Sequence, residues 1–138
     1  MFDIFISHSG NDKTSFVEPL VTELKKLGLC IWYDKYNINK GDNIRESIIN
    51  GINESVIFVA IISNQYYQSN WANLELGILQ ANYPNNFLSI LFSDVKEFTA
   101  EKYPFLLNYS YIEAEYPICN IANILKNIVF EKKQERGL

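Results

Sequence analysis

The segment VIFVAII, from Val56 to Ile62, decides how this chain folds. It is an unbroken apolar run rich in β-branched residues, without the polar alternation of a half-exposed strand. Such a run is typical of a parallel strand that is covered on both faces. A strand of this kind needs helices above and below its sheet, so the flanking sequence should supply both helices and further parallel strands.

Four other segments have a strand-like apolar character, and helical patterns alternate with them. The strand-like segments are residues 2–6, 29–34, 87–92 and 109–113. Apolar residues recur at helical spacing over residues 16–27, 44–52, 71–79 and 121–128. The first of these helices should end at Gly28. The alternation predicts an α/β fold: a doubly wound, five-stranded parallel sheet with helices on both faces.

Size, charge and composition fit one globular domain. The chain has 138 residues, a hydrophobic content of 48% and a net charge of −4. We expect a single domain over residues 1–132, followed by a polar tail or linker at residues 133–138. The sequence lacks a run of basic residues and any apolar run near the roughly 20 residues of a membrane helix. We therefore expect neither a nucleic-acid nor a membrane partner.

The start of the chain and its cysteines favour a cytoplasmic protein. The N-terminal residues MFDIFISHS continue directly into a strand pattern and lack the charged start of a signal peptide. The chain has two cysteines, Cys30 and Cys119, which lie far apart in sequence. Reduced thiols in the cytoplasm fit this usage best.

Several common chemistries lack the residues that they need. The chain has neither the P-loop motif G-x-x-x-x-G-K-[ST] nor the dinucleotide motif G-x-G-x-x-G. His8 is the single histidine, so we expect no metal site and no cofactor. We interpret His8 as a partly exposed part of its loop rather than a catalytic base. A response-regulator receiver would need an aspartate at the end of the third strand, where this chain has Ile62 and Ser63.

Polar segments follow the first three predicted strands. In open parallel sheets, ligands bind beyond the carboxyl ends of the strands. The segments at those ends are SHSGND (residues 7–12), DKYNINKGDN (34–43) and SNQYYQSNW (63–71). The last two contain aromatic residues, among them Tyr36, Tyr66 and Tyr67, which fit either stacking on a ligand or covering the core. We expect the binding site among these three segments.

Trp71 and Glu75 are four residues apart in a helical pattern, so they should share one face of a helix. That face is otherwise apolar, and two interpretations fit it. Trp71 can be a core anchor with Glu75 at the solvated edge of the apolar stripe, as is usual for glutamate. Alternatively, the face lines a cleft in which the carboxylate has a chemical role.

Four pieces of the sequence, in this order, resemble the TIR domain family. They are FDIFISHSGND (residues 2–12), IWYDKYNINKGDNI (31–44), VIFVAIIS (56–63) and SNWANLEL (69–76). The resemblance covers about residues 2–130 and implies a flavodoxin-like sheet, the TIR fold. Residues Lys35–Asp42 resemble the BB loop of the family. The loops and helices are more similar to bacterial TIR proteins and NAD-cleaving animal TIR domains than to Toll-receptor adaptors.

The resemblance implies an enzyme that cleaves NAD+. NAD-cleaving TIR domains have a glutamate four residues after a tryptophan, and Trp71 and Glu75 match that spacing. It follows that Glu75 is the implied catalytic residue. The implied substrate-binding residues are Trp71, Ser9, Tyr33, Asp34, Lys40 and Gly41. Two departures are Ala72, where many members have cysteine, and Ser9–Gly10, where the animal enzymes have arginines.

The implied reaction is cleavage of the nicotinamide–ribose bond by an NAD+ glycohydrolase or cyclase, with NAD+ as substrate and no cofactor. The products would be nicotinamide and ADP-ribose or a cyclic isomer, in bacterial antiphage defence or immune signalling. The implied partners are other TIR domains, a fused or associated sensor or effector domain, and a second copy bound through Lys35–Asp42. One alternative is a non-catalytic TIR–TIR interaction module. Another is a sensor that binds a nucleotide without cleaving it.

Overall fold

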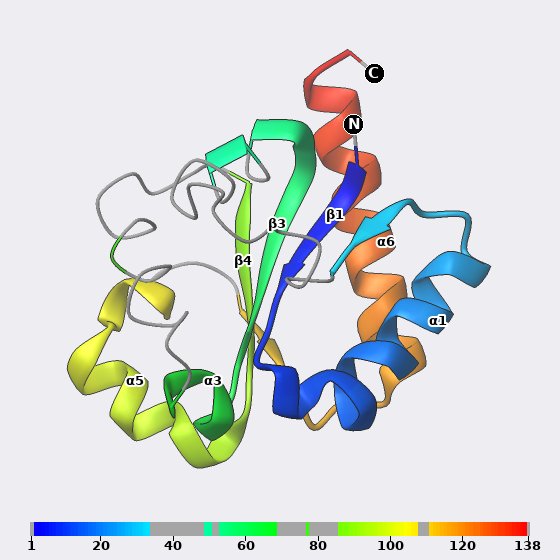
Figure 1. Ribbon diagram of the computed structural model, residues 1–138. Coiled ribbons are helices and arrows are strands. Elements are labelled where there is room, and N and C mark those ends of the chain that lie inside the picture. The colour runs from blue at the N-terminus through cyan, green and yellow to red at the C-terminus, as the bar shows by residue number, and fades with distance from the viewer. Residues whose placement is uncertain are drawn as a thin grey trace, which may run out of the picture.

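The structure, a computed structural model, describes residues 2–33, 49–50, 53–68, 77, 86–107 and 111–137. The described strands form one five-stranded sheet in the order β2-β1-β3-β4-β5 (Figure 1). All neighbouring strands in it are parallel, and β3 occupies the centre. The predicted doubly wound α/β fold is therefore confirmed.

Five strands and four helices carry the described part of the fold. The strands are β1 (Phe2–Ser7), β2 (Ile31–Trp32), β3 (Ser55–Ile62), β4 (Phe87–Leu91) and β5 (Ile112–Glu113). The helices are α1 (Glu18–Lys26), α3 (Asn64–Gln68), α5 (Lys96–Lys102) and α6 (Ile118–Glu135). Short helical turns accompany them: η1 (Gly10–Asp12), η2 (Lys13–Val17), η4 (Ser93–Val95) and η5 (Pro104–Leu106).

The central strand β3 supplies side chains to two apolar cores, one on each face of the sheet. Val59 and Ile61 face the layer formed by α1 and α6. Phe58 and Ala60 face the opposite core, on the side of α3 and α5 (Figure 1). Every residue of β3 is buried. This two-sided burial explains why residues Val56–Ile62 include no polar position.

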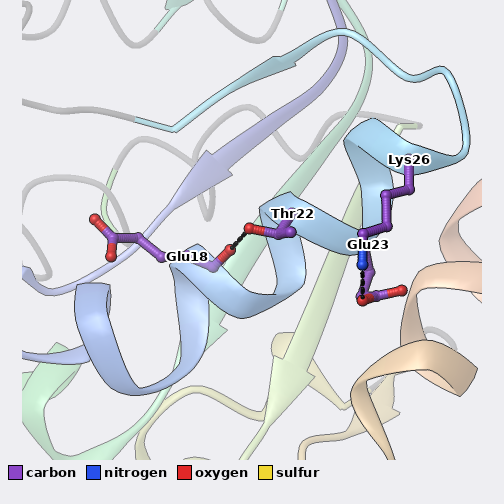
Figure 2. Close-up of polar contacts among 4 residues, drawn as sticks. All are labelled: Glu18, Thr22, Glu23 and Lys26. Carbon is purple, nitrogen blue, oxygen red and sulfur yellow. Dashed lines mark hydrogen bonds and ion pairs between the residues drawn. The ribbon is translucent and has the colours of Figure 1, made fainter.

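Helix α1 begins later than the apolar spacing predicts. Residues Lys13–Val17 form a wider π-type turn, and the regular helix starts at Glu18, so Pro19 lies in its first turn where a missing N–H is tolerated. Gly28 follows the helix with a φ of 84°, as expected for a C-terminal glycine. Figure 2 shows polar contacts along the helix: Thr22 Oγ1 donates to the Glu18 carbonyl at 2.9 Å, and Lys26 Nζ lies 3.2 Å from Glu23 Oε1.

Four elements differ from the sequence-based expectation. Residues Asn64–Gln68, expected as a polar loop, are helical and belong to α3, and α5 lies in a stretch for which no helix was predicted. β2 is limited to Ile31–Trp32, shorter than the predicted strand. The final helix extends beyond the predicted range, from Ile118 to Glu135. The predicted helices over 44–52 and 71–79 lie outside the described residues, except for residues 49, 50 and 77.

Polar contacts join the C-terminal end of α6 to the N-terminal ends of the strands. Lys133 Nζ lies 2.7 Å from Asp3 Oδ1, and the other oxygen of Asp3 accepts from the Cys30 amide at 2.7 Å. Arg136 Nη1 donates to the Ser55 carbonyl at 3.5 Å. Asp3 therefore joins β1, the start of β2 and α6.

Within the part of the chain that is described, no helix has the length and apolar character needed to cross a membrane.

Candidate active site

The strand order indicates a ligand site between the ends of β1 and β3. From β1 the chain moves outward to β2, and then returns to the other side of β1 to form β3. In sheets with this order, ligands bind outside the carboxyl ends of the strands at the point where the winding changes direction. Those ends are Ser7 of β1, which is in register with Ala60, and Ile62 of β3. The segments that follow Ser7 and Ile62 are therefore the candidate site.

The segment after β1 is a tight turn between two buried residues, Ser9 and Asp12. Ser9 caps the turn η1, because its hydroxyl accepts a hydrogen bond from the Asn11 amide at 3.2 Å. The Ser9 carbonyl also accepts from the Asp12 amide at 3.0 Å. Ser9 and Asp12 are only 4% and 8% exposed. Ser9 is therefore the cap of η1, and the side chain of Asp12 bonds elsewhere.

His8 holds this turn against the end of β2. Its Nδ1 lies 2.8 Å from the Ser9 carbonyl oxygen, and its Nε2 contacts the carbonyl oxygen of Tyr33. His8 is 1% exposed, so the prediction of a partly exposed residue is wrong. The reason is that β1 is an inner strand with β2 and β3 on its two sides. Both ring nitrogens face backbone carbonyls, which supports the scaffold role that we expected for His8.

A buried pair, Asp12 and Ser63, joins the turn after β1 to the helix after β3. Ser63 Oγ donates to Asp12 Oδ2 at 2.5 Å. Ser63 Oγ also accepts a hydrogen bond from the Tyr66 amide at 3.0 Å, so Ser63 caps α3. Asp12 and Ser63 are both buried. The two segments that follow the strand ends are therefore linked by a carboxyl, a hydroxyl and a backbone amide in series.

Two further contacts reinforce this junction. Asn11 Nδ2 donates to Gln65 Oε1 at 3.0 Å, across the surface above the buried pair. Tyr66 is fully buried, and its hydroxyl lies 3.4 Å from Ser7 Oγ. Of the two interpretations left open for Tyr66, covering the core is therefore the correct one.

Tyr67 joins α3 to α5. Its hydroxyl lies 2.5 Å from Thr99 Oγ1, and Thr99 donates its own proton to the Val95 carbonyl at 2.7 Å. Tyr67 must therefore donate to Thr99. Burial raises the pKa of Tyr67 to about 12, so the phenol stays protonated at neutral pH. Its ring stacks on Tyr103 with centroids 5.7 Å apart, so Tyr67 covers the sheet like Tyr66.

The structure places two of the predicted site residues at this edge. Ser9 lies in the turn after β1, and Tyr33 follows β2, where its carbonyl contacts His8 and its ring lies 5.7 Å from Lys25 Nζ. The catalytic candidate and four binding candidates lie outside the described residues: Glu75, Trp71, Asp34, Lys40 and Gly41. Tyr36 and the loop Lys35–Asp42 lie outside them too. Across the described ranges, no group of three His, Cys, Asp or Glu side chains is placed to hold a metal ion.

Sequence reasoning missed the Asp12–Ser63 pair and the Tyr67–Thr99 contact. A signal for the first was present, because a serine directly after a buried strand is a good cap for a following helix. Its partner could not be found from sequence, since Asp12 lies 51 positions away. The contact of Tyr67 with Thr99 depends on α5, a helix that the apolar pattern did not predict.

Comparison with known proteins agrees with this architecture. The TIR domain family matches residues 4–116 of the chain. The 2' cyclic ADP-D-ribose synthase AbTIR of Acinetobacter baumannii (strain 1295743) is 37% identical over 90 residues, which are 65% of this chain. The NAD(+) hydrolase TcpC of Escherichia coli O6:H1 (strain CFT073) is 31% identical over 137 residues, which are 96% of this chain.

A solved structure shares the fold. The TIR domain of the Toll-related receptor TRR-2 from Hydra magnipapillata superposes with a TM-score of 0.69, at 18% identity, over 93% of this chain and 98% of that domain. The chain spans only 34% and 45% of the length of the two enzymes named above. The family match covers most of the described sheet and the edge at its carboxyl ends. This chain is therefore a member of the TIR domain family.

Proposed function

We propose that this chain is an NAD+ glycohydrolase or cyclase that cleaves the bond between nicotinamide and ribose. The observation that carries the proposal is the Trp71–Glu75 spacing, in a chain of which 96% matches part of an NAD(+) hydrolase. The relative named as a 2' cyclic ADP-D-ribose synthase supports the same bond cleavage with a cyclic product.

The chemistry requires little from the protein beyond a well-placed anion. Nicotinamide leaves as a neutral ring from a cationic one, so the departing group needs no proton. Positive charge develops on the ribose, as it does in glycoside hydrolysis, where a carboxylate stabilises the oxocarbenium-like state. Glu75 has this role in our proposal, both through charge and by accepting hydrogen bonds from ribose hydroxyls. Its attraction to the sugar is stronger where water is excluded.

The other predicted residues have binding roles in this proposal. Trp71 supplies a flat surface for the pyridinium ring through a cation–π contact. The Ser9 hydroxyl, which already accepts from Asn11, retains a proton that it can donate to a substrate oxygen. Tyr33, Asp34, Lys40 and Gly41 border the substrate at the end of β2 and in the loop that follows.

Self-association through the loop Lys35–Asp42 is part of the proposal. A head-to-tail contact in which this loop, including Ile38 and Lys40, completes the site of a neighbouring copy need not close, and so builds filaments. Activity then rises with protein concentration more steeply than in direct proportion. We place this activity in cytoplasmic bacterial defence or signalling, with a sensor or effector domain fused to or associated with the TIR domain.

Concentrated protein incubated with NAD+ should release nicotinamide together with ADP-ribose or a cyclic isomer. Water as the nucleophile gives ADP-ribose, whereas attack by an atom of the same substrate gives a ring. Chromatography with mass detection identifies the products over a range of protein concentrations. Binding of NAD+ with thermal stabilisation but without turnover would instead indicate a sensor. Neither binding nor turnover would indicate an interaction module.

Replacing Trp71 by alanine should raise KM for NAD+ about 30-fold and lower kcat less, because one desolvated cation–π contact is worth about 2 kcal/mol. Initial-rate measurements over a range of NAD+ concentrations separate the two constants. Exposed Phe130 on α6 is a matched site for an aromatic-to-alanine control, and Phe130→Ala should leave both constants unchanged. An unchanged KM in Trp71→Ala would rule out stacking as the role of this residue.

A further inference from the structure

We infer that Asp12 and Ser63 form a positioning pair that fixes the direction in which the chain leaves α3 toward Trp71 and Glu75. The inference rests on the function proposed above, and it assigns a role to two buried polar residues that do not themselves carry the chemistry. Neither residue touches substrate in this scheme. Their effect on the reaction passes through the backbone of α3.

The first step is the orientation of the Ser63 hydroxyl. Serine has one hydroxyl proton, and Ser63 donates it to Asp12 Oδ2 at 2.5 Å. A lone pair then remains for the Tyr66 amide, which donates to the same oxygen at 3.0 Å. A hydrogen bond to a carboxylate polarises the hydroxyl and strengthens it as an acceptor. Asp12 therefore stabilises the cap of α3 without contacting the helix.

The second step is the dependence of α3 on such anchors. The position of a helix in a protein is stabilised mostly by its contacts with the rest of the fold. The described residues of α3, Asn64–Gln68, have such contacts to two other elements. Ser63 and Gln65 join them to the turn after β1, and Tyr67 joins them to Thr99 of α5.

The third step connects this helix to the proposed chemistry. Trp71 lies three residues after Gln68, and Glu75 lies seven residues after Gln68. A rotation of α3 is therefore passed into the chain that carries both residues. Displacement of a reacting group by about 1 Å can lower a rate by about 10²-fold, even when the substitution is far from the reacting atoms.

The test compares kcat and KM for nicotinamide release in a set of matched variants. Asp12→Ala and Ser63→Ala should each lower kcat about 10- to 100-fold, with KM changed by less than about threefold. The double variant should be no slower than the slower single variant, because the two residues act as one unit. Ser63→Thr keeps the hydroxyl and should recover kcat to within about threefold of the wild type.

Asp3→Ala is the matched control. It also removes an aspartate that bonds to neighbouring elements, but Asp3 lies at the start of β1, where it pairs with Lys133 and accepts from the Cys30 amide. Its kcat should stay within about twofold of the wild type at equal amounts of folded protein. Asp12→Asn is a milder variant that keeps an acceptor for Ser63, and its kcat should lie between those of the wild type and Asp12→Ala.

Hydrogen exchange provides a readout that does not depend on activity. Asp12→Ala should speed exchange of the Tyr66 amide, although Asp12 does not contact that amide, and Asp3→Ala should not. Unchanged Tyr66 exchange in Asp12→Ala would overturn the orientation step. If the wild type cleaves NAD+ and the two alanine variants retain its kcat, only the positioning role is overturned. If the wild type itself releases no nicotinamide, the positioning role fails together with the proposed function.

Discussion

Replacing Glu75 by glutamine should lower the rate of nicotinamide release from NAD+ about 10³-fold, while the protein stays folded. Glutamine preserves the size of the side chain and can still accept a hydrogen bond from a ribose hydroxyl. It cannot supply the negative charge that stabilises a developing oxocarbenium ion. The loss should therefore appear in kcat, and KM should change much less because the ground-state sugar carries no such charge.

The matched control is Glu101→Gln, which removes the same charge from an exposed position of α5. Its kcat and KM should match those of the wild type. Circular dichroism and the midpoint of urea unfolding check that each variant is folded. A Glu75→Gln protein that releases nicotinamide at the wild-type rate would remove the proposed mechanism, whatever products the wild type forms.

The sheet is predictable from the sequence because two-sided burial leaves a clear pattern. Residues Val56–Ile62 of β3 include no polar residue, since their side chains contact apolar cores on both faces. The edge strand β2 is harder to delimit, because Ile31 and Trp32 are only half-buried and polar residues follow. The loops that border the candidate site follow from the strand order alone, once the sheet is parallel.

The contacts within the site are not predictable in the same way. α3 forms because Ser63 caps it and its neighbours hold it, so no apolar period marks residues 64–68. The buried ring of His8 contacts the carbonyl oxygen of Tyr33, and the 25 positions that separate the two residues hide this contact from local patterns. The role of Glu75 follows from its spacing to Trp71 and from family resemblance, and it stays a prediction.

Replacing Phe58 by alanine should lower the free energy of unfolding by about 3–5 kcal/mol, the usual cost of removing a fully buried phenylalanine. Phe58 is 0% exposed and lies in the centre of the sheet. Its ring stacks on Phe5 of β1 at 4.9 Å and on Phe87 of β4 at 5.9 Å. Phe5 in turn stacks on Trp32 of β2 at 4.2 Å.

These four rings lie side by side because the strand register aligns them. Phe5 is paired with Trp32 and with Phe58, and Phe58 is paired with Phe87. Parallel in-register strands place equivalent side chains next to one another on one face. Offset stacking adds about 0.5–1.5 kcal/mol per pair beyond the burial of area. A double-mutant cycle with Phe5→Leu and Phe58→Leu should therefore show a coupling energy in that range.

Urea unfolding with linear extrapolation measures each variant. Phe130→Ala is the matched control, because Phe130 is 61% exposed on α6 and the same atoms are removed. It should change the free energy of unfolding by about 0.5 kcal/mol or less. Phe58→Leu retains most of the buried volume and should cost about 1.5 kcal/mol or less, plus the lost stacking. A Phe58→Ala variant no less stable than Phe130→Ala would mean that the aligned rings do not stabilise the sheet.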